Sequence, residues 1–253
     1  MEDVVTAPCQ SLITQSHRAL EAKSPTNGDG FGLAWYGERP EPGLYRDILP
    51  AWSDPNLRSL CRQIRSHVFF AHVRAATLGA TSRANCHPFV VGRWTFMHNG
   101  QIGGFERMRR RVERGLSDTT YDARQGTTDS ELFFLLMLDE NLEADPFTAA
   151  QAGVARVLAA AEDAGIEPHI RLTAAFTDGD CVHAVRYATD AFAPTLYTGQ
   201  FCGTAGRCLV SEPLDRQGAA WQAVPPGSFV TMTRQAVTIR PFMVGKSPVA
   251  ALA

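Results

Sequence analysis

The sequence lacks the features that mark membrane, secreted and nucleic-acid-binding proteins. No apolar run approaches the ~20 residues that a membrane-spanning helix needs. The first residues, Met1 to Thr6, contain neither the basic nor the apolar region of a signal peptide. The formal net charge of -2 provides no general attraction to nucleic acid or to acidic membranes. We therefore expect a cytoplasmic protein that has no nucleic-acid partner and no membrane partner.

Cysteine is sparse and irregularly spaced. The six cysteines form no Cys-x-x-Cys pair and no metal-ligand spacing with the histidines, which excludes the common zinc and dithiol motifs. We therefore expect no metal and no cofactor. In a reducing cytoplasm most free thiols are small buried side chains. We expect this for most of the six, which are Cys9, Cys61, Cys86, Cys181, Cys202 and Cys208.

The composition is otherwise that of an ordinary globular protein. Of the 253 residues, 45% are hydrophobic and 20% are charged, which suits one large domain or two small ones. No low-complexity linker divides the chain and no internal repeat is visible. We therefore expect a single domain over residues 1–253, built from two sheets and a helical layer.

Helix signals occur at five places along the chain. The predicted helices lie at 11–20, from Asp54, over 105–115, from Thr128 and over 147–164. Asp54-Pro55 has the form of an N-cap followed by proline at the first helical position. Thr128-x-x-Glu131 has the form of a capping box, which places Asp129 in the first helical turn. The arginines of 105–115 favour a solvated helix face over a nucleic-acid site.

Strand signals are short apolar runs separated by Gly, Pro and Asp. The predicted strands cover 33–36, 68–73, 94–97, 172–176, 182–187, 196–198, 208–210, 229–233 and 236–239. The segment 38–50, which is rich in Pro, Gly and charge, is predicted to be an exposed loop.

The strand at 94–97 is predicted to end in a turn at His98-Asn99-Gly100. Asn and Gly both tolerate positive φ, so Asn-Gly is a strong turn signal. A turn at a strand end leaves backbone N–H groups free. The Asn99 amide beside the Gly100 N–H would then supply the two donors of an oxyanion hole. The same dipeptide is also the commonest hairpin turn, and this segment alone favours the plain hairpin.

Two further polar residues follow apolar elements in the same way. Arg74 comes directly after the strand at 68–73, and Asp129 begins a helix. A guanidinium suits a carboxylate and an aspartate suits an ammonium group, so the pair would hold an α-amino acid by both ends. The side chain of that amino acid would reach toward Asn99 and Gly100. The alternative, that Arg74 and Asp129 simply pair with each other, remains equally open.

An ordered set of motifs resembles the class II glutamine amidotransferases, and most of all their stand-alone YafJ/EgtC/DUG-like branch. The resemblance covers nearly the whole chain. Its motifs are Asn27-Gly28-Asp29-Gly30-Phe31-Gly32, Ala71-His72-Val73-Arg74-Ala75-Ala76-Thr77, Asn85-Cys86-His87-Pro88-Phe89, Phe96-Met97-His98-Asn99-Gly100, Thr128-Asp129-Ser130-Glu131, Val210-Ser211-Glu212-Pro213-Leu214 and Val224-Pro225-Pro226-Gly227.

The resemblance implies a fold and a set of site residues. The fold is the α+β N-terminal-nucleophile hydrolase sandwich, with four layers in the order αββα. Arg74 would bind the glutamine carboxylate and Asp129 its ammonium group, while Asn99 and the Gly100 N–H would form the oxyanion hole. Thr77 and His87 fall in motifs that line the substrate pocket. His98 is expected to be a packed structural histidine, since the family takes its general base elsewhere.

The chain departs from the family at the nucleophile. The family nucleophile is a cysteine exposed as the first residue, whose α-amino group relays the proton. Here Met1 is followed by Glu2, and the first cysteine is Cys9. The segment 1–6 resembles the family's residues just after its first strand, so we expect the nucleophile strand upstream of Met1. Without this strand we expect the chain to be inactive. We also expect it to be less stable, because the backbone hydrogen-bonding groups of the neighbouring strands and the apolar surface beneath would be exposed.

The resemblance leaves three functional hypotheses. As an amidohydrolase, the protein would cleave glutamine and pass ammonia to a separate synthase subunit, or it would hydrolyse a γ-glutamyl peptide or thiol conjugate on its own. As a catalytically silent module, it would bind γ-glutamyl compounds or a partner protein without turnover. The sequence leaves the oligomeric state open, a homodimer included.

Overall fold

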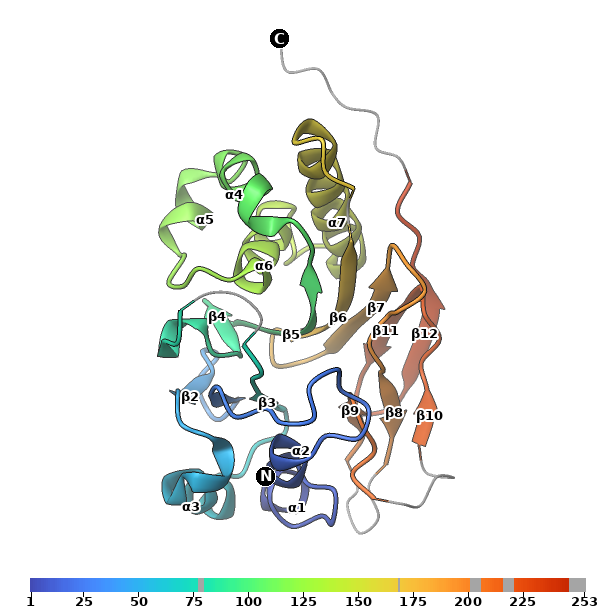
Figure 1. Cartoon of the computed structure of the whole chain (residues 1–253). Helices are drawn as coiled ribbons and strands as arrows, with labels where there is room; N and C mark the ends of the chain where they lie inside the picture. Colours follow the sequence, from blue (N-terminus) through green and yellow to red (C-terminus); the bar gives the residue numbers. More distant parts are fainter. Residues whose placement is uncertain (77–79, 168, 201–205, 216–220, 246–253) are drawn as a thin grey trace.

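A six-stranded antiparallel sheet forms one inner layer of the computed structural model, which describes residues 1–76, 80–167, 169–200, 206–215 and 221–245 (Figure 1). The strand order is β12-β11-β7-β6-β5-β4. The strands are β4 (Phe89–Val91), β5 (Trp94–Ile102), β6 (Ile170–Thr177), β7 (Val182–Ala188), β11 (Ser228–Met232) and β12 (Val237–Pro241). Nearly every residue of β6 is buried, which explains its continuous apolar run: both faces of this central strand are covered.

The second inner layer consists of two separate three-stranded sheets. One has the order β2-β1-β3 and the other β10-β8-β9, and all of their pairings are antiparallel. Their strands are β1 (Phe31–Trp35), β2 (Gly43–Asp47), β3 (Phe69–Val73), β8 (Tyr197–Gly199), β9 (Cys208–Val210) and β10 (Trp221–Ala223). Both sheets pack on the six-stranded sheet through one apolar cluster that includes Ala34, Phe70 and Ala175.

Helices cover the two outer faces. They are α1 (Glu2–Val5), α2 (Leu12–His17), α3 (Pro55–Gln63), α4 (Phe105–Arg114), α5 (Asp118–Asp122), α6 (Asp129–Asp139) and α7 (Pro146–Asp163), with short 3-10 turns at η1 (Ala51–Ser53) and η2 (Arg83–Asn85). The helices α4, α6 and α7 cover the six-stranded sheet, and α1 to α3 cover the β2-β1-β3 sheet. The expected four-layer αββα order is confirmed.

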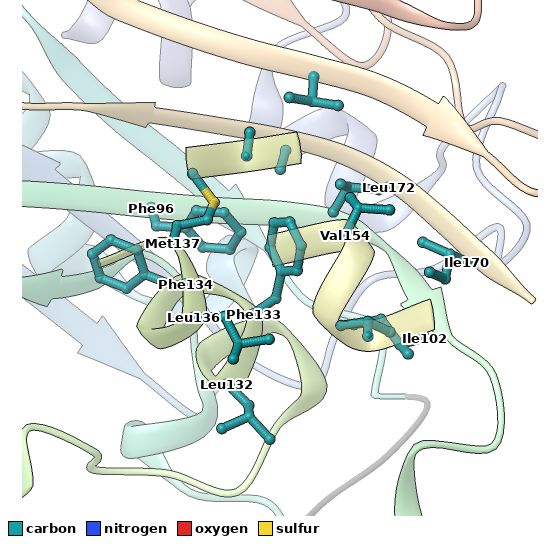
Figure 2. Packing of buried hydrophobic residues seen from close by; sticks show 14 of the residues in the cluster. Phe96, Ile102, Leu132, Phe133, Phe134, Leu136, Met137, Val154, Ile170 and Leu172 are labelled. Atoms are coloured by element: carbon teal, nitrogen blue, oxygen red, sulfur yellow. The ribbon is translucent and has the colours of Figure 1, made fainter. Parts of the chain in front are cut away.

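The largest apolar cluster joins the six-stranded sheet to its helices (Figure 2). At its centre Phe96 of β5 stacks on Phe134 of α6, with ring centroids 5.2 Å apart. Residues 129–137 of α6 are all buried, so this helix has no solvated face. The helix that begins with Asp129 is therefore fixed in position by the core on every side.

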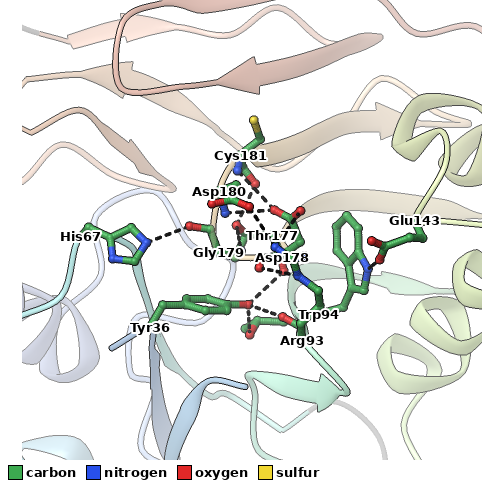
Figure 3. A network of polar contacts seen from close by, with 11 residues as sticks. Tyr36, His67, Arg93, Trp94, Glu143, Thr177, Asp178, Gly179, Asp180 and Cys181 are labelled. Atoms are coloured by element: carbon green, nitrogen blue, oxygen red, sulfur yellow. Dashed lines mark hydrogen bonds and ion pairs between the residues drawn. The ribbon is translucent and has the colours of Figure 1, made fainter. Parts of the chain in front are cut away.

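A buried tyrosine ties the two inner layers together at one end. Tyr36 follows β1, and its hydroxyl lies 2.7 Å from the Arg93 carbonyl, 2.8 Å from Thr95 Oγ1 and 3.0 Å from the Thr177 carbonyl (Figure 3). Burial raises the pKa of Tyr36 to about 12, so it stays protonated and can donate to one carbonyl at a time. This contact lies at the end of β1 away from the Asn27–Gly30 segment.

Two predictions about elements are wrong, and so is the prediction that most cysteines are buried. The segment 38–50 is not simply a loop, because it contains β2, which pairs with β1. The strand that starts at Trp94 does not stop at a turn: it continues through Asn99-Gly100 to Ile102 and pairs with β6 throughout. Pairing decides both cases: β2 forms a hairpin with the preceding strand β1, and the pairing of β5 with the distant strand β6 overrides the local turn propensity of Asn99-Gly100. Among the described cysteines only Cys61 and Cys86 are buried, whereas Cys181 and Cys208 are partly exposed and Cys9 is exposed; Cys202 lies outside the described residues.

Candidate active site

A large cavity separates the two three-stranded sheets. Its volume is about 1560 Å³, and every residue of β3 and of β9 lines it. In the described parts of the chain, β3 pairs only with β1 and β9 only with β8, so each turns an unpaired edge toward this space. The floor is the six-stranded sheet, and residues of α1 and α2 close one side. We call this space the intersheet cavity.

The intersheet cavity collects the predicted site residues. Five of them line it although they come from four separate segments: Arg74, His87, Asn99, Gly100 and Asp129. The sixth, Thr77, lies outside the described residues. The assignment of individual roles remains a prediction, but the structure brings the side chains into one cavity.

Arg74 is held by the glycine-rich segment that precedes β1. It is only 5% exposed, and its Nη1 donates to the Asp29 carbonyl over 3.3 Å. The backbones also pair, since the Arg74 N–H donates to Gly30 O (2.8 Å) and the Asp29 N–H donates to Arg74 O (2.9 Å). Gly30 has a φ of +122°, and a Cβ there would lie 2.6 Å from the Cys86 sulfur. The glycines therefore allow a close backbone approach that fixes the arginine.

Gly100 is required by a close contact inside the sheet and not by a turn. Its φ is +150°, and a Cβ there would lie 1.9 Å from the Arg171 carbonyl oxygen and 2.5 Å from His98 Nε2. No side chain fits at those distances. The backbone of β5 beside Asn99 is thus distorted at the point where the cavity meets β6.

His98 links helix α6 to strand β6 beside Gly100. It is 3% exposed, with Nε2 lying 3.1 Å from the Arg171 carbonyl and Nδ1 lying 2.9 Å from Ser130 Oγ. Burial lowers its pKa, which favours the neutral ring. A carbonyl can only accept, so Nε2 carries the proton and Nδ1 accepts from the Ser130 hydroxyl. These contacts agree with a structural role for His98.

Asp129 joins helix α6 to the end of β5. Its Oδ2 accepts from the Ile102 N–H and its Oδ1 from the Ser130 N–H, both over 2.8 Å. The aspartate is 7% exposed and sits at the helix N-terminus, where a negative charge is favoured. Its position relative to Asn99 is therefore set by hydrogen bonds to the strand that carries Asn99.

The predicted capping box is only half present. The Thr128 side chain accepts from the Glu131 N–H over 3.1 Å, as expected. The Glu131 carboxylate does not return to Thr128; it accepts from the N–H groups of Gln125 (2.8 Å) and Gly126 (2.7 Å). Glu131 thus holds the preceding loop against the helix start.

Two histidines bring unsatisfied nitrogens to the cavity wall. The rings of His72 and His87 lie 4.4 Å apart between centroids. Nδ1 of His72 and both ring nitrogens of His87 are buried without a hydrogen-bond partner in the described chain. Burial lowers the pKa of His72 to about 4 and that of His87 well below its usual value, so both rings are neutral near pH 7. Sequence reasoning did not single out His72, although it lies two residues before Arg74 and therefore on the same strand face.

The described residues contain neither a metal-binding cluster nor a membrane span. Within these ranges no group of three or more His, Cys, Asp or Glu side chains is arranged to hold a metal ion. No helix in the described part of the chain has the length and apolar character needed to cross a membrane.

The fold and this cavity define the class of protein. Two stacked antiparallel sheets between helical layers, with an arginine, an Asn-Gly pair and a helix-terminal aspartate around one intersheet cavity, have the architecture of an N-terminal-nucleophile hydrolase. The chain belongs to the class II glutamine amidotransferases, whose family model matches residues 1–195.

Individual relatives agree with this placement. The chain is 32% identical to the probable glutamine amidotransferase DUG3 of Saccharomyces cerevisiae, over 96% of this chain and 81% of the relative. It is 26% identical to a gamma-glutamyl-hercynylcysteine sulfoxide hydrolase of Mycolicibacterium smegmatis, over 95% of this chain and 94% of the relative. Among solved structures, a glutamine aminotransferase class-II domain protein from Silicibacter pomeroyi is 44% identical, covers 85% of this chain and 92% of its own, and superposes with a TM-score of 0.77.

Proposed function

We propose that this protein is an amidohydrolase of the glutamine amidotransferase type that cleaves a γ-glutamyl amide. The observation that carries the proposal is the convergence of Arg74, Asn99, Gly100 and Asp129 on one cavity. Arg74 binds the α-carboxylate and Asp129 the α-ammonium group of the glutamyl substrate. The Asn99 amide and the Gly100 N–H stabilise the oxyanion that forms at the γ-carbonyl, and His87 lines the same pocket.

The reaction runs through a thioester in this proposal. A cysteine thiolate attacks the γ-carbonyl, its α-amino group having taken the thiol proton, and the carbonyl oxygen becomes negative in the oxyanion hole. The C–N bond breaks when the α-ammonium returns that proton to the leaving nitrogen, which departs as ammonia or an amine. Water then attacks the thioester, releasing glutamate and restoring the thiol.

We assign the cysteine to a strand that fills the intersheet cavity. The support is the gap itself: β3 and β9 line it, each with an edge unpaired among the described residues, so one strand that pairs with both would join the two sheets into one. The chain without such a strand is expected to be inactive, and a chain that carries the strand is expected to melt at a higher temperature.

Relatives favour hydrolysis of a γ-glutamyl compound without a fused synthase. The mycobacterial relative, named as a gamma-glutamyl-hercynylcysteine sulfoxide hydrolase, matches this chain over 94% of its own length. Delivery of ammonia to a separate synthase subunit is the second enzymatic version. In that version glutaminase activity requires the partner, and in the first it does not.

The test combines mass, binding and turnover on protein purified from its own source. The intact mass and N-terminal sequence show whether a cysteine begins the mature chain. Calorimetry with L-glutamine is then compared with an ammonia assay. We expect Arg74→Ala to abolish binding, whereas Arg83→Ala, at an exposed ion pair with Asp47, binds normally. Unchanged affinity of Arg74→Ala would remove the carboxylate site, and binding without turnover would support the catalytically silent module.

A further inference from the structure

One face of the outer helical layer carries a line of four arginines. On α4 the side chains of Phe105, Met108 and Val112 are buried in the core, so the opposite face of the helix points to solvent. The exposed residues at positions i, i+3, i+4 and i+7 of that face are all arginines, namely Arg107, Arg110, Arg111 and Arg114. We call these four residues the arginine stripe.

The arginine stripe differs from the arginines beside it. Glu113 pairs with Arg109 over 2.7 Å and also with Arg124, so its carboxylate is shared between these two. Among the described residues, none of the four stripe arginines forms an ion pair. Like charges four residues apart, such as Arg107 and Arg111, destabilise a helix, and a positive charge in the first turn opposes the helix dipole. The stripe therefore lowers the stability of the helix that carries it.

An acidic patch lies beside the stripe in the same helical layer (Figure 1). Near the start of α4, a Cβ on Gly104 would lie 2.8 Å from Ile166 Cγ2, just after the end of α7. At the other end of α4, Arg156 Nη2 of α7 donates to the Gly115 carbonyl, so the two helices run antiparallel. Around the end of α7 lie three exposed acids that form no ion pair within the described chain, here called the acidic patch: Glu162, Asp163 and Glu167.

We propose that this surface binds a second copy of the chain, with the arginine stripe of each copy on the acidic patch of the other. A surface with adjacent basic and acidic regions is complementary to itself after a two-fold rotation, which is the commonest symmetry of protein dimers. A guanidinium can pair with a carboxylate through two hydrogen bonds, so arginine suits such contacts. A nucleic acid fits less well, because its phosphates would be repelled by the acidic patch.

The proposed contact leaves the intersheet cavity open in both copies. Leu172 and Phe176 of β6 belong to the cluster beneath α4 and α7, whereas Thr173 and Ala175 of the same strand line the cavity. Alternate residues of a strand point to opposite faces of the sheet. The dimer surface and the cavity therefore lie on opposite sides of the six-stranded sheet, and the proposal does not depend on the proposed function.

The experiment measures dimer formation of the full protein by sedimentation equilibrium. We expect a monomer–dimer equilibrium whose dissociation constant rises about tenfold or more between about 50 mM and about 500 mM NaCl, because salt screens exposed charge pairs. Arg107→Glu combined with Arg111→Glu should weaken the dimer by at least about tenfold, since like charges then face each other. Glu162→Arg combined with Asp163→Arg should do the same.

Mixing the two double variants tests the occupant directly. In a mixed dimer one contact is wild-type, and in the other contact both regions have reversed charges. The mixture should therefore form a heterodimer that is at least about tenfold tighter than the homodimer of either variant. All the substituted side chains are exposed, so the variants should fold, and far-UV circular dichroism checks this.

Arg58→Glu combined with Arg62→Glu is the matched control. These arginines are exposed and lie four residues apart on α3, and the Arg62 side chain donates to the Arg58 carbonyl. The Arg111 side chain donates to the Arg107 carbonyl in the same way. The control changes the net charge by the same amount, but α3 covers the other outer face of the molecule. The affinity of the dimer should stay within about twofold of wild type.

Each contrary result overturns the proposal at a separate step. A wild-type protein that stays monomeric at low salt forms no such dimer. A dimer that resists salt, or that the α4 and α3 double variants weaken equally, uses another surface. Double variants that fail to pair when mixed exclude the acidic patch as the partner of the stripe. A monomeric wild type that binds poly-L-glutamate, when the α4 double variant does not, assigns the stripe to a different acidic protein.

Discussion

The two inner layers of this protein are built from the same kind of antiparallel strand but serve different ends. The six-stranded sheet is a continuous ladder, with long β5 and β6 at its centre and a dense cluster of phenylalanines beneath. The facing layer is divided into two three-stranded sheets by a cavity of about 1560 Å³. The continuous ladder stabilises one layer, whereas the divided layer leaves the edges of β3 and β9 unpaired among the described residues.

The contrast extends to polar groups between the layers. At the Tyr36 end, the buried hydroxyl has three oxygen neighbours within 3.0 Å. At the cavity, His72 and His87 bring buried nitrogens that have no partner among the described residues. Buried polar atoms are nearly always satisfied, so we expect these nitrogens to pair with a group that enters the cavity, whereas the Tyr36 hydroxyl is already satisfied.

The largest expected effect is on the continuous layer. Phe96 is completely buried and stacks on Phe134, so Phe96→Ala should lower the free energy of unfolding by about 3–5 kcal/mol. Leu44→Ala, at a 37% exposed position on β2, should cost less than about 1 kcal/mol. Urea titrations of both variants check the contrast. Similar losses would contradict the assignment of Phe96 to the centre of the core.

The second-largest expected effect is on the rate of turnover and not on the stability of the fold. Asn99→Ala should reduce turnover by about 10²–10³, or about 2.7–4 kcal/mol, as for loss of one oxyanion donor. Steady-state kinetics on the mature protein measure it, and Gln222→Ala, at an exposed position on β10, provides the control. Near-normal turnover of Asn99→Ala would return this stretch to the status of an ordinary strand.

A pH effect should arise from the cavity histidines. The pKa of His72 is lowered from 6.5 to about 4, so between these values the unfolded chain binds a proton that the folded chain does not. Stability should therefore fall as the pH drops from 6.5 toward 4, by up to about 3 kcal/mol. His72→Asn should flatten this part of the stability curve, and exposed His169→Asn should not. A curve of unchanged slope in His72→Asn would contradict the assignment.

The smallest effect is at the closed end. Tyr36→Phe removes one hydroxyl from a site that keeps Thr95 and two backbone carbonyls, so about 1 kcal/mol of stability should be lost. The same change at Tyr121, which is 44% exposed, should be neutral. Thermal unfolding of the two variants tests this. A loss well above about 3 kcal/mol would show that the hydroxyl alone holds the layers together.

Local patterns were enough to predict much of the fold. The helix that begins at Pro55 has Asp54 as its cap, and Asp129 opens α6, because these signals operate within one turn of helix. Strand β2 was missed because its residues are not apolar enough to stand out, and its pairing with β1 defines it.

For Gly100, the sequence points to the right residue, but the structure shows a different physical reason for it. Gly100 was singled out as a turn residue, whereas it is needed because Arg171 comes close from a strand 71 positions away in the chain. Glu212 lies in a motif of the family resemblance, but its hydrogen bonds to Leu20, Glu21 and Ala22 could not be predicted, since these partners are 190 to 192 residues distant. Contacts of this kind depend on topology and cannot be read from periodicity.

The link through His98 has a consequence for how the cavity would take up a substrate. One neutral imidazole fixes a carbonyl of β6 and a hydroxyl of the first turn of α6, directly beside Asn99 and Gly100. The groups on this side are therefore ordered before any ligand arrives, and binding there sacrifices little conformational entropy. A ligand that binds on this side of the cavity therefore meets a rigid template.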